Sequence, residues 1–162
     1  MAEFVHVVVP VFAAVASGLF AGLFFTFSVA VMPGLARAGD RVMIEAMQGV
    51  NVAILNPFFA LVFIGAPVAV LACLVLHASV GAAAAAGWSA AALACLVAAM
   101  LITFGVNVPR NNALERVGPP ERVADPAAVR GAFEGVWVRW NHLRTLFSVV
   151  GLVCAVTALT VR

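Results

Sequence analysis

The chain has 162 residues, of which 65% are hydrophobic and only 10% are charged, and its formal net charge is +2. A soluble domain carries about 25% charged residues, so this composition excludes an ordinary soluble domain and predicts an integral membrane protein. The small net charge also excludes the broad basic surface that nucleic-acid binding requires.

The first apolar run covers residues 4–32 and ends at Pro33-Gly34. It is too long for the core of a signal peptide, and no positive charge precedes it, so we expect an uncleaved transmembrane helix. The next segment, residues 40–52, places apolar residues at helical spacing among polar ones. Asp40 is a suitable N-cap. We expect a short amphipathic helix that lies at the membrane interface.

Three more apolar runs, at about residues 57–76, 88–106 and 142–161, are long enough to cross a bilayer. Asn56-Pro57 is typical of a helix start. Asp125-Pro126 is a second start of this kind, so one long helix is expected from Pro126 to Val161, with its first half outside the hydrocarbon or along the interface.

Between the third and fourth runs, Asn112 with Glu115 resembles a capping box and predicts a separate short helix. The predicted fold is therefore an all-α membrane protein: one domain, residues 1–162, built as a bundle of four transmembrane helices. The interfacial helix would join the first two spans, and the polar loops would cover residues 33–56 and 107–139.

The arginines predict the orientation of the bundle. Eight of the nine lie in or beside the two polar loops, and Arg162 is the exception. By the positive-inside rule these loops face the cytoplasm and both termini face outward. Arginine without lysine and many alanines favour a bacterial source, so we expect the bacterial cytoplasmic (inner) membrane. The Gly18-x-x-x-Gly22 step allows close helix packing and leaves a homo-oligomer open.

Polar side chains gather near the predicted cytoplasmic side, where burial in hydrocarbon is costly. Trp137, Asn141, Arg144 and Ser148 form one stripe along a helix. Taken singly, each polar residue has a structural explanation, such as capping a helix or reaching lipid phosphate. Together they predict a pocket at the inner leaflet. The amide and guanidinium members are Gln48, Asn51, Asn56, Asn107, Asn111, Asn112, Asn141 and Arg144.

Titratable side chains narrow the chemistry. His142 lies beside the stripe and is the nearby side chain that could act as a base near neutral pH. His6 and His77 lie near the outer ends of their spans and could ligate a haem or a metal. All carboxylates lie outside the spans, which argues against a proton-coupled transporter.

Several segments together resemble the anthrone oxygenase-like family of small four-span membrane proteins. The resemblance is carried by Gly22-Leu23-Phe24 followed by Val31-Met32-Pro33-Gly34-Leu35, Met47-Gln48-Gly49-Val50-Asn51 with Asn56-Pro57, Asn107-Val108-Pro109-Arg110-Asn111-Asn112-Ala113-Leu114 and Trp137-Val138-Arg139-Trp140-Asn141-His142-Leu143-Arg144-Thr145. Named members of the family oxidise anthrones to anthraquinones with dioxygen, without a classical cofactor.

The resemblance implies a site for a lipophilic aromatic ligand and no resident cofactor. On this hypothesis Arg144, Asn141 and Asn107 stabilise an oxyanion, His142 takes the proton, and Trp137 and Trp140 stack on the substrate. The remaining candidates for substrate binding are Gln48, Asn51, Asn56, Asn111 and Asn112.

Three other functions stay open from the residues alone. The same pocket would suit a non-catalytic membrane module that binds a lipid, a quinone or a partner protein. The two outer histidines leave a haem- or metal-binding membrane protein as another alternative. A transporter or channel is the last.

Overall fold

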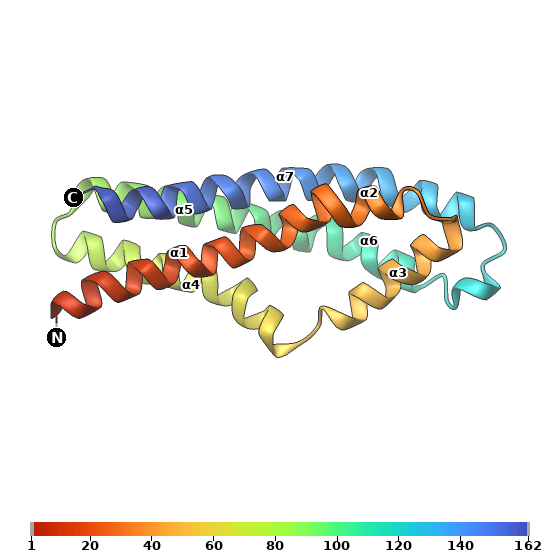
Figure 1. The fold of residues 1–162 in the computed structure, drawn as a ribbon, viewed down its shortest axis with the longest axis horizontal. Helices are drawn as coiled ribbons and strands as arrows, with labels where there is room; N and C mark the ends of the chain where they lie inside the picture. Colours follow the sequence, from red (N-terminus) through yellow and green to blue (C-terminus); the bar gives the residue numbers. More distant parts are fainter. Residues whose placement is uncertain (1, 162) are drawn as a thin grey trace.

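A computed structural model describes the backbone of residues 2–161 and the side chains of residues 5–161. Within these residues the chain is helical and contains no strand. Four long helices dominate: α1 (Ala2–Thr26), α4 (Pro57–Ser79), α5 (Ala83–Ile102) and α7 (Pro126–Thr160). They pack side by side as an elongated bundle (Figure 1). The predicted all-α architecture with four spans is confirmed.

The four spans are longer than a bilayer requires. The continuous helical segments cover Val5–Leu35, Pro57–Ser79, Ala83–Glu115 and Pro126–Thr160. A helix rises about 1.5 Å per residue and the hydrocarbon core is about 30 Å thick, so about 20 residues suffice. The 35-residue helix α7 therefore extends well beyond the hydrocarbon, as the Asp125-Pro126 start predicted.

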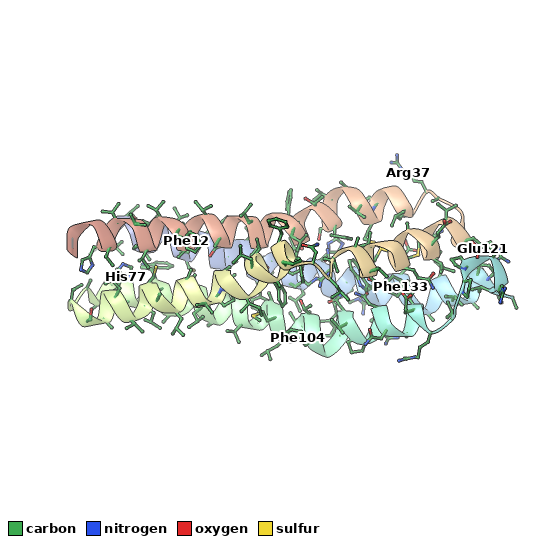
Figure 2. The ribbon with its side chains drawn as sticks, turned by 90° about the horizontal axis from the view of Figure 1, so that it is seen from below. Phe12, Arg37, His77, Phe104, Glu121 and Phe133 are labelled. Atoms are coloured by element: carbon green, nitrogen blue, oxygen red, sulfur yellow. The ribbon has the colours of Figure 1, made fainter. Side chains whose placement is uncertain are left out.

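Both chain ends lie at one end of the bundle, and the polar connections lie at the other (Figure 1). Figure 2 shows His77 near the first end, Phe104 near the middle, and Phe133 and Glu121 in the opposite half. This arrangement is the one expected for four antiparallel spans. Arg162, the arginine predicted on the side of the termini, lies outside the described residues.

Two π-helical turns interrupt long helices. The first, η1 (Phe27–Val31), joins α1 to α2 (Met32–Leu35), and the second, η2 (Thr103–Asn107), joins α5 to α6 (Val108–Glu115). Each ends two residues before a proline, Pro33 or Pro109. Proline cannot donate a backbone hydrogen bond and clashes with the carbonyl four residues earlier, a mismatch that a widened turn accommodates. Helices therefore continue through both prolines.

This continuity corrects one prediction from the sequence. Asn112 does not cap a new helix, because α6 begins at Val108 and continues the axis of α5 through η2. The capping-box pattern was misleading since Pro109 is tolerated within the helix. The short 3₁₀ turn η3 (Pro120–Arg122) then leads to α7.

The amphipathic helix predicted after the first span is present as α3 (Asp40–Ala53). Its apolar residues Met43, Ile44 and Met47 are fully buried. They pack with Leu114 of α6, and with Phe133 and Trp137 of α7. The apolar residues Met43, Ile44 and Met47 thus face other helices of the protein, while Val42 and Val52 of the same helix are exposed. The placement of α3 at the membrane interface stays a prediction.

Helices α3 and α4 together complete the fourth side of the bundle. They meet at residues 54–56 in a bend that points away from the other helices near the middle of the long axis (Figure 1). Asn56 caps α4, accepting from the Phe59 backbone N–H at 2.9 Å and donating to the Ala53 carbonyl at 2.8 Å. The bend leaves room beside it for a cavity.

The far end of the bundle is held by arginines. Arg130 of α7 forms ion pairs with Asp40 at 3.0 Å and Glu134 at 2.6 Å, and donates to the Ala38 and Ala36 carbonyls. Arg41 donates to the carbonyls of Pro120 and Val123. These hydrogen bonds and ion pairs connect the turn after α2 to α7, and the segment after α6 to α3.

Candidate functional site

A cavity of about 800 Å³ opens beside the bend between α3 and α4. Its walls are mainly apolar and aromatic, with contributions from α1, η1, α3, α4, η2, α6 and α7. Such a volume is in the range of small-molecule sites. Its aromatic lining comprises Phe24, Phe27, Phe59, Phe63, Phe104 and Trp137, and its polar or charged lining comprises Asn51, Asn56, Thr103, Asn111, Asn112, Glu115 and Arg144.

Arg144 is the cation of the cavity lining, and only 6% of its surface is exposed. Its guanidinium carbon lies 4.3 Å from the ring centre of Phe24 and 5.0 Å from that of Trp137, which are cation–π distances. Among the side chains described, no carboxylate forms an ion pair with it. A buried cation without a counter-ion is costly, so this arrangement favours an anionic or strongly polar ligand.

Hydrogen bonds fix the orientation of the guanidinium. Its Nε donates to Asn141 Oδ1 at 2.9 Å, and Nη1 makes a long bond of 3.4 Å to Thr103 Oγ1. No acceptor in the described part of the chain bonds to Nη2. Because Nε only donates, the Asn141 amide can have only one orientation. Its Nδ2 then donates to the Phe24 carbonyl and to Ser28 Oγ at 2.7 Å.

Both π turns contribute to this arrangement. Ser28 belongs to η1, and Thr103 and Asn107 belong to η2. Asn107 is fully buried and donates to the Trp137 carbonyl at 3.2 Å. Helices α1 and α5 therefore widen where their side chains meet Asn141, Arg144 and Trp137, and π turns of this kind are frequent at functional sites.

Trp137 forms a wall of the cavity and is 2% exposed. Its indole Nε1 donates to Asn111 Oδ1 of α6 at 2.7 Å. The ring also packs against Phe27 and Phe133, with ring centres 5.6 and 6.1 Å apart. The indole is thus held on several sides by contacts within the protein.

The structure brings six of the predicted site residues to this cavity, including residues far apart in sequence. One of these six residues, Asn56, already uses both its Nδ2 and its Oδ1 in the cap of α4. The six are Asn51, Asn56, Asn111, Asn112, Trp137 and Arg144.

Three other predicted residues support the cavity without lining it. Asn141 and Asn107 act through Arg144 and Trp137, as described above. Gln48 donates to the carbonyls of Leu114 and Gly118 at 2.9 and 3.1 Å. It therefore joins α3 to the end of α6, and its amide is not available to a ligand in the cavity.

Trp140 and His142 lie elsewhere, and the expectation that they share the cavity is corrected. They line a shallow groove on another face of α7, with Arg139, Leu143 and Leu146. His142 is exposed and bonds through Nδ1 to Ser28 Oγ at 3.1 Å. For His142 the physical reason is helical geometry, because it follows Asn141 by one residue and therefore points to another side of α7. Trp140 is three residues from Trp137 and four from Arg144, so packing and not spacing places it in the groove.

The sequence analysis missed Phe24, Ser28, Thr103 and Glu115 as parts of this site. Glu115 is the carboxylate of the cavity lining, and a signal for it existed. Asn111, Asn112 and Glu115 are close in sequence and lie on one helix. Phe24 belongs to one of the family-like segments, but that segment did not indicate a role in the site. Ser28 gave no signal, because its role depends on how α1 packs against α7.

The opposite end of the bundle does not fit a haem. His77 Nδ1 bonds to Ser89 Oγ at 3.0 Å, and the void beside the pair is about 10 Å³. That volume holds about one water molecule. No group of three or more potential metal ligands occurs among the side chains described. A haem ligated by His77 inside the bundle has no room there.

Comparisons with known proteins identify the family. No curated protein and no solved structure matches the chain significantly. The family model described as anthrone oxygenase matches residues 58–154, from the start of α4 almost to the end of α7. This match covers more than half of the chain and includes Thr103, Asn111, Trp137, Asn141 and Arg144. The resemblance seen in the sequence is thereby confirmed, and the chain belongs to the anthrone oxygenase family.

Proposed function

We propose that this protein is a membrane-embedded oxygenase that oxidises a lipophilic aromatic substrate, anthrone-like or quinol-like, with dioxygen. One observation carries the proposal. A buried, unpaired Arg144 faces a cavity of about 800 Å³ with aromatic walls. Family membership supports an oxygenase-like reaction, and the geometry supplies a place where a flat aromatic anion would be stabilised.

The chemistry follows from the acidity of an anthrone. Loss of one proton from its CH₂ group gives an extended phenolate, whose oxygen Arg144 would stabilise through Nη1 and Nη2. The anion transfers an electron to dioxygen, and the two radicals combine at the same carbon to give a hydroperoxide after protonation. Loss of water breaks the O–O bond and the remaining C–H bond. Overall, anthrone and O₂ yield anthraquinone and H₂O.

The proton acceptor differs from the one first expected. His142 does not line the cavity, so it cannot reach a substrate carbon beside Arg144. Glu115 lines the cavity on α6, three turns beyond Thr103. Glu115 is therefore our candidate for the final proton acceptor, reached through water because about three helical turns separate it from Thr103, which bonds Arg144.

The membrane supplies the route for the substrate. Ile64 of α4 and Phe104 of η2 line the cavity and are 49% and 57% exposed. Since both belong to spans, a lipophilic molecule would enter between them from the bilayer. We place the protein in the bacterial inner membrane with both termini outside, because the arginines gather at the end of the bundle away from the termini.

The test is oxygen uptake by the purified protein in lipid nanodiscs with anthrone as substrate. The proposal expects one anthraquinone formed per O₂ consumed, and a loss of at least about 100-fold in Arg144→Ala. Empty nanodiscs measure the uncatalysed oxidation. The proposal would be contradicted if oxygen uptake were no faster with the protein than with empty nanodiscs, or if the Arg144→Ala variant were as active as the parent protein.

A further inference from the structure

The shallow groove on α7 is a second recess of the protein, separate from the cavity beside Arg144. Its volume is about 460 Å³, and its lining comprises Arg139, Trp140, His142, Leu143 and Leu146. None of these residues lines the cavity. The groove therefore has its own set of side chains, and the proposed oxygenase reaction does not use it.

The groove lies where α7 passes from the headgroup layer into the hydrocarbon. From Thr145 to Thr160 the helix carries no charged residue. Because about 20 residues cross the hydrocarbon, its boundary on this side lies near His142. The arginine and the tryptophan of the groove are then level with lipid headgroups, where tryptophan is frequent. Leu143 and Leu146 lie about one and two turns deeper, among acyl chains.

Arg139 is the permanent cation of the groove. It is exposed, and it forms no ion pair with any of the side chains described. Glu134, the acid that precedes it on α7, is already paired with Arg130. No carboxylate belongs to the described lining of the groove. The groove is therefore positively charged without a counter-ion of its own. Charge complementarity favours an anionic ligand over one that also carries a cation.

Hydrogen bonds fix the imidazole of His142 beside this charge. Asn141 Nδ2 donates to Ser28 Oγ, and the Thr145 hydroxyl donates to the Asn141 carbonyl at 2.8 Å. The single hydrogen of the Ser28 hydroxyl then goes to Thr145 Oγ1 at 2.9 Å. His142 Nδ1 is therefore the donor in its bond of 3.1 Å to Ser28. Nε2 is the ring nitrogen that remains for a ligand, and it donates when the ring is protonated.

We infer that this groove binds an anionic phospholipid from the leaflet that surrounds it. The phosphate oxygens accept from the Arg139 guanidinium and from His142 Nε2 of the protonated ring. One acyl chain lies along Leu143 and Leu146, beside the Trp140 ring. The side chains along α7 change from cationic to apolar in the same order as the parts of a phospholipid. Basic recesses beside membrane helices bind anionic headgroups in this way.

The test is native mass spectrometry of the protein in detergent, titrated with phosphatidylglycerol or with phosphatidylcholine of the same acyl chains. The dissociation constant of the first bound lipid is compared. We expect phosphatidylglycerol to bind at least about fivefold more tightly, the contribution typical of one arginine near an anionic surface. Equal affinities would overturn the inference. A dimer that binds no lipid would overturn it too, because a second copy of the chain would then cover the groove.

Arg139→Gln should lower the affinity for phosphatidylglycerol about fivefold and leave that for phosphatidylcholine unchanged, so that the preference is lost. The matched control is Arg110→Gln on α6. Arg110 is exposed and lies outside the groove. Its depth is similar, since its neighbours Asn107 and Asn111 both bond to Trp137. The control should keep the preference. An equal loss in both variants would indicate general attraction to positive charge and overturn the groove as the site.

Two further measurements separate a phospholipid site from a simple anion site. Glycerophosphoglycerol, the same headgroup without acyl chains, should not displace phosphatidylglycerol at equal concentration. Leu146→Asn removes an apolar contact with the acyl chain, so it should weaken both lipids by the same factor and keep the preference. Displacement by the headgroup alone, or unchanged affinities in Leu146→Asn, would show that the groove holds no acyl chain and would refute the phospholipid.

Discussion

The two halves of the bundle bury polar groups in contrasting ways. Near the termini, His77 and Ser89 bond to each other beside a void of about 10 Å³. In the other half, Arg144 and Asn51 keep unused donors beside a cavity of about 800 Å³. A satisfied polar pair in tight packing holds helices together. Unsatisfied donors around an open space have no such structural use, and therefore indicate a ligand.

The largest effect is expected from Arg144→Met. Turnover should fall by at least about 100-fold, since the group that stabilises the oxyanion is gone. Thermal stability should stay equal or rise, because replacing a buried, unpaired charge with an apolar side chain of similar length removes a desolvation cost. Oxygen uptake and a melting curve in the same nanodiscs measure both. A large drop in melting temperature would show that Arg144 is structural, as His77 is.

The next effect concerns Asn141, which orients Arg144. Asn141→Ala should lower turnover about tenfold, by about 1.4 kcal/mol of transition-state stabilisation. Asn141→Asp keeps an acceptor for Arg144 Nε yet pairs its charge, so it should lower turnover further. Steady-state rates at saturating anthrone decide between the two. If the Asp variant recovers parental activity, orientation alone matters and the unpaired charge does not.

Two glycine substitutions in α7 test how closely the helices pack in the half of the bundle near the termini, through their effect on the free energy of unfolding. A methyl group on Gly151 would lie 3.2 Å from Cys95 Cβ and from Leu96 Cδ2, whereas one on Gly135 would meet nothing within 4 Å. Gly151→Ala is therefore expected to destabilise the protein by about 1–2 kcal/mol through overpacking. Gly135→Ala should be neutral or stabilising, since alanine favours helices over glycine. Denaturation in mixed micelles compares them, and equal stabilities would contradict the close packing.

The smallest effect is expected from His142→Phe. Its imidazole lies outside the cavity and contacts Ser28, so turnover should change less than about threefold, under 0.7 kcal/mol. The pH profile of turnover should keep its shape. A loss above about tenfold would indicate that His142 is the base and would count against Glu115 as the proton acceptor.

Much of this fold could be predicted because the bilayer imposes simple rules. Apolar runs long enough to cross it became helices, and Asp125-Pro126 and Asn56-Pro57 both start helices as predicted. The errors came where local signals competed with packing. Asn112 has the sequence of a cap, yet α6 continues α5 because a π turn takes up Pro109. The buried apolar residues of α3 are covered by α6 and α7, which no periodicity could reveal.

The candidate site shows the same division. The spacing of Trp137, Asn141 and Arg144 was enough to place them on one face of a helix, because an α-helix fixes which positions align. Sequence alone also determined that eight arginines gather around two loops. Only the tertiary structure decided that Arg144 has no carboxylate partner among the described side chains, that Asn111 accepts from the Trp137 indole, and that His142 faces elsewhere. Those facts depend on distances between helices, which arise from packing and are not written in the order of residues along any one of them.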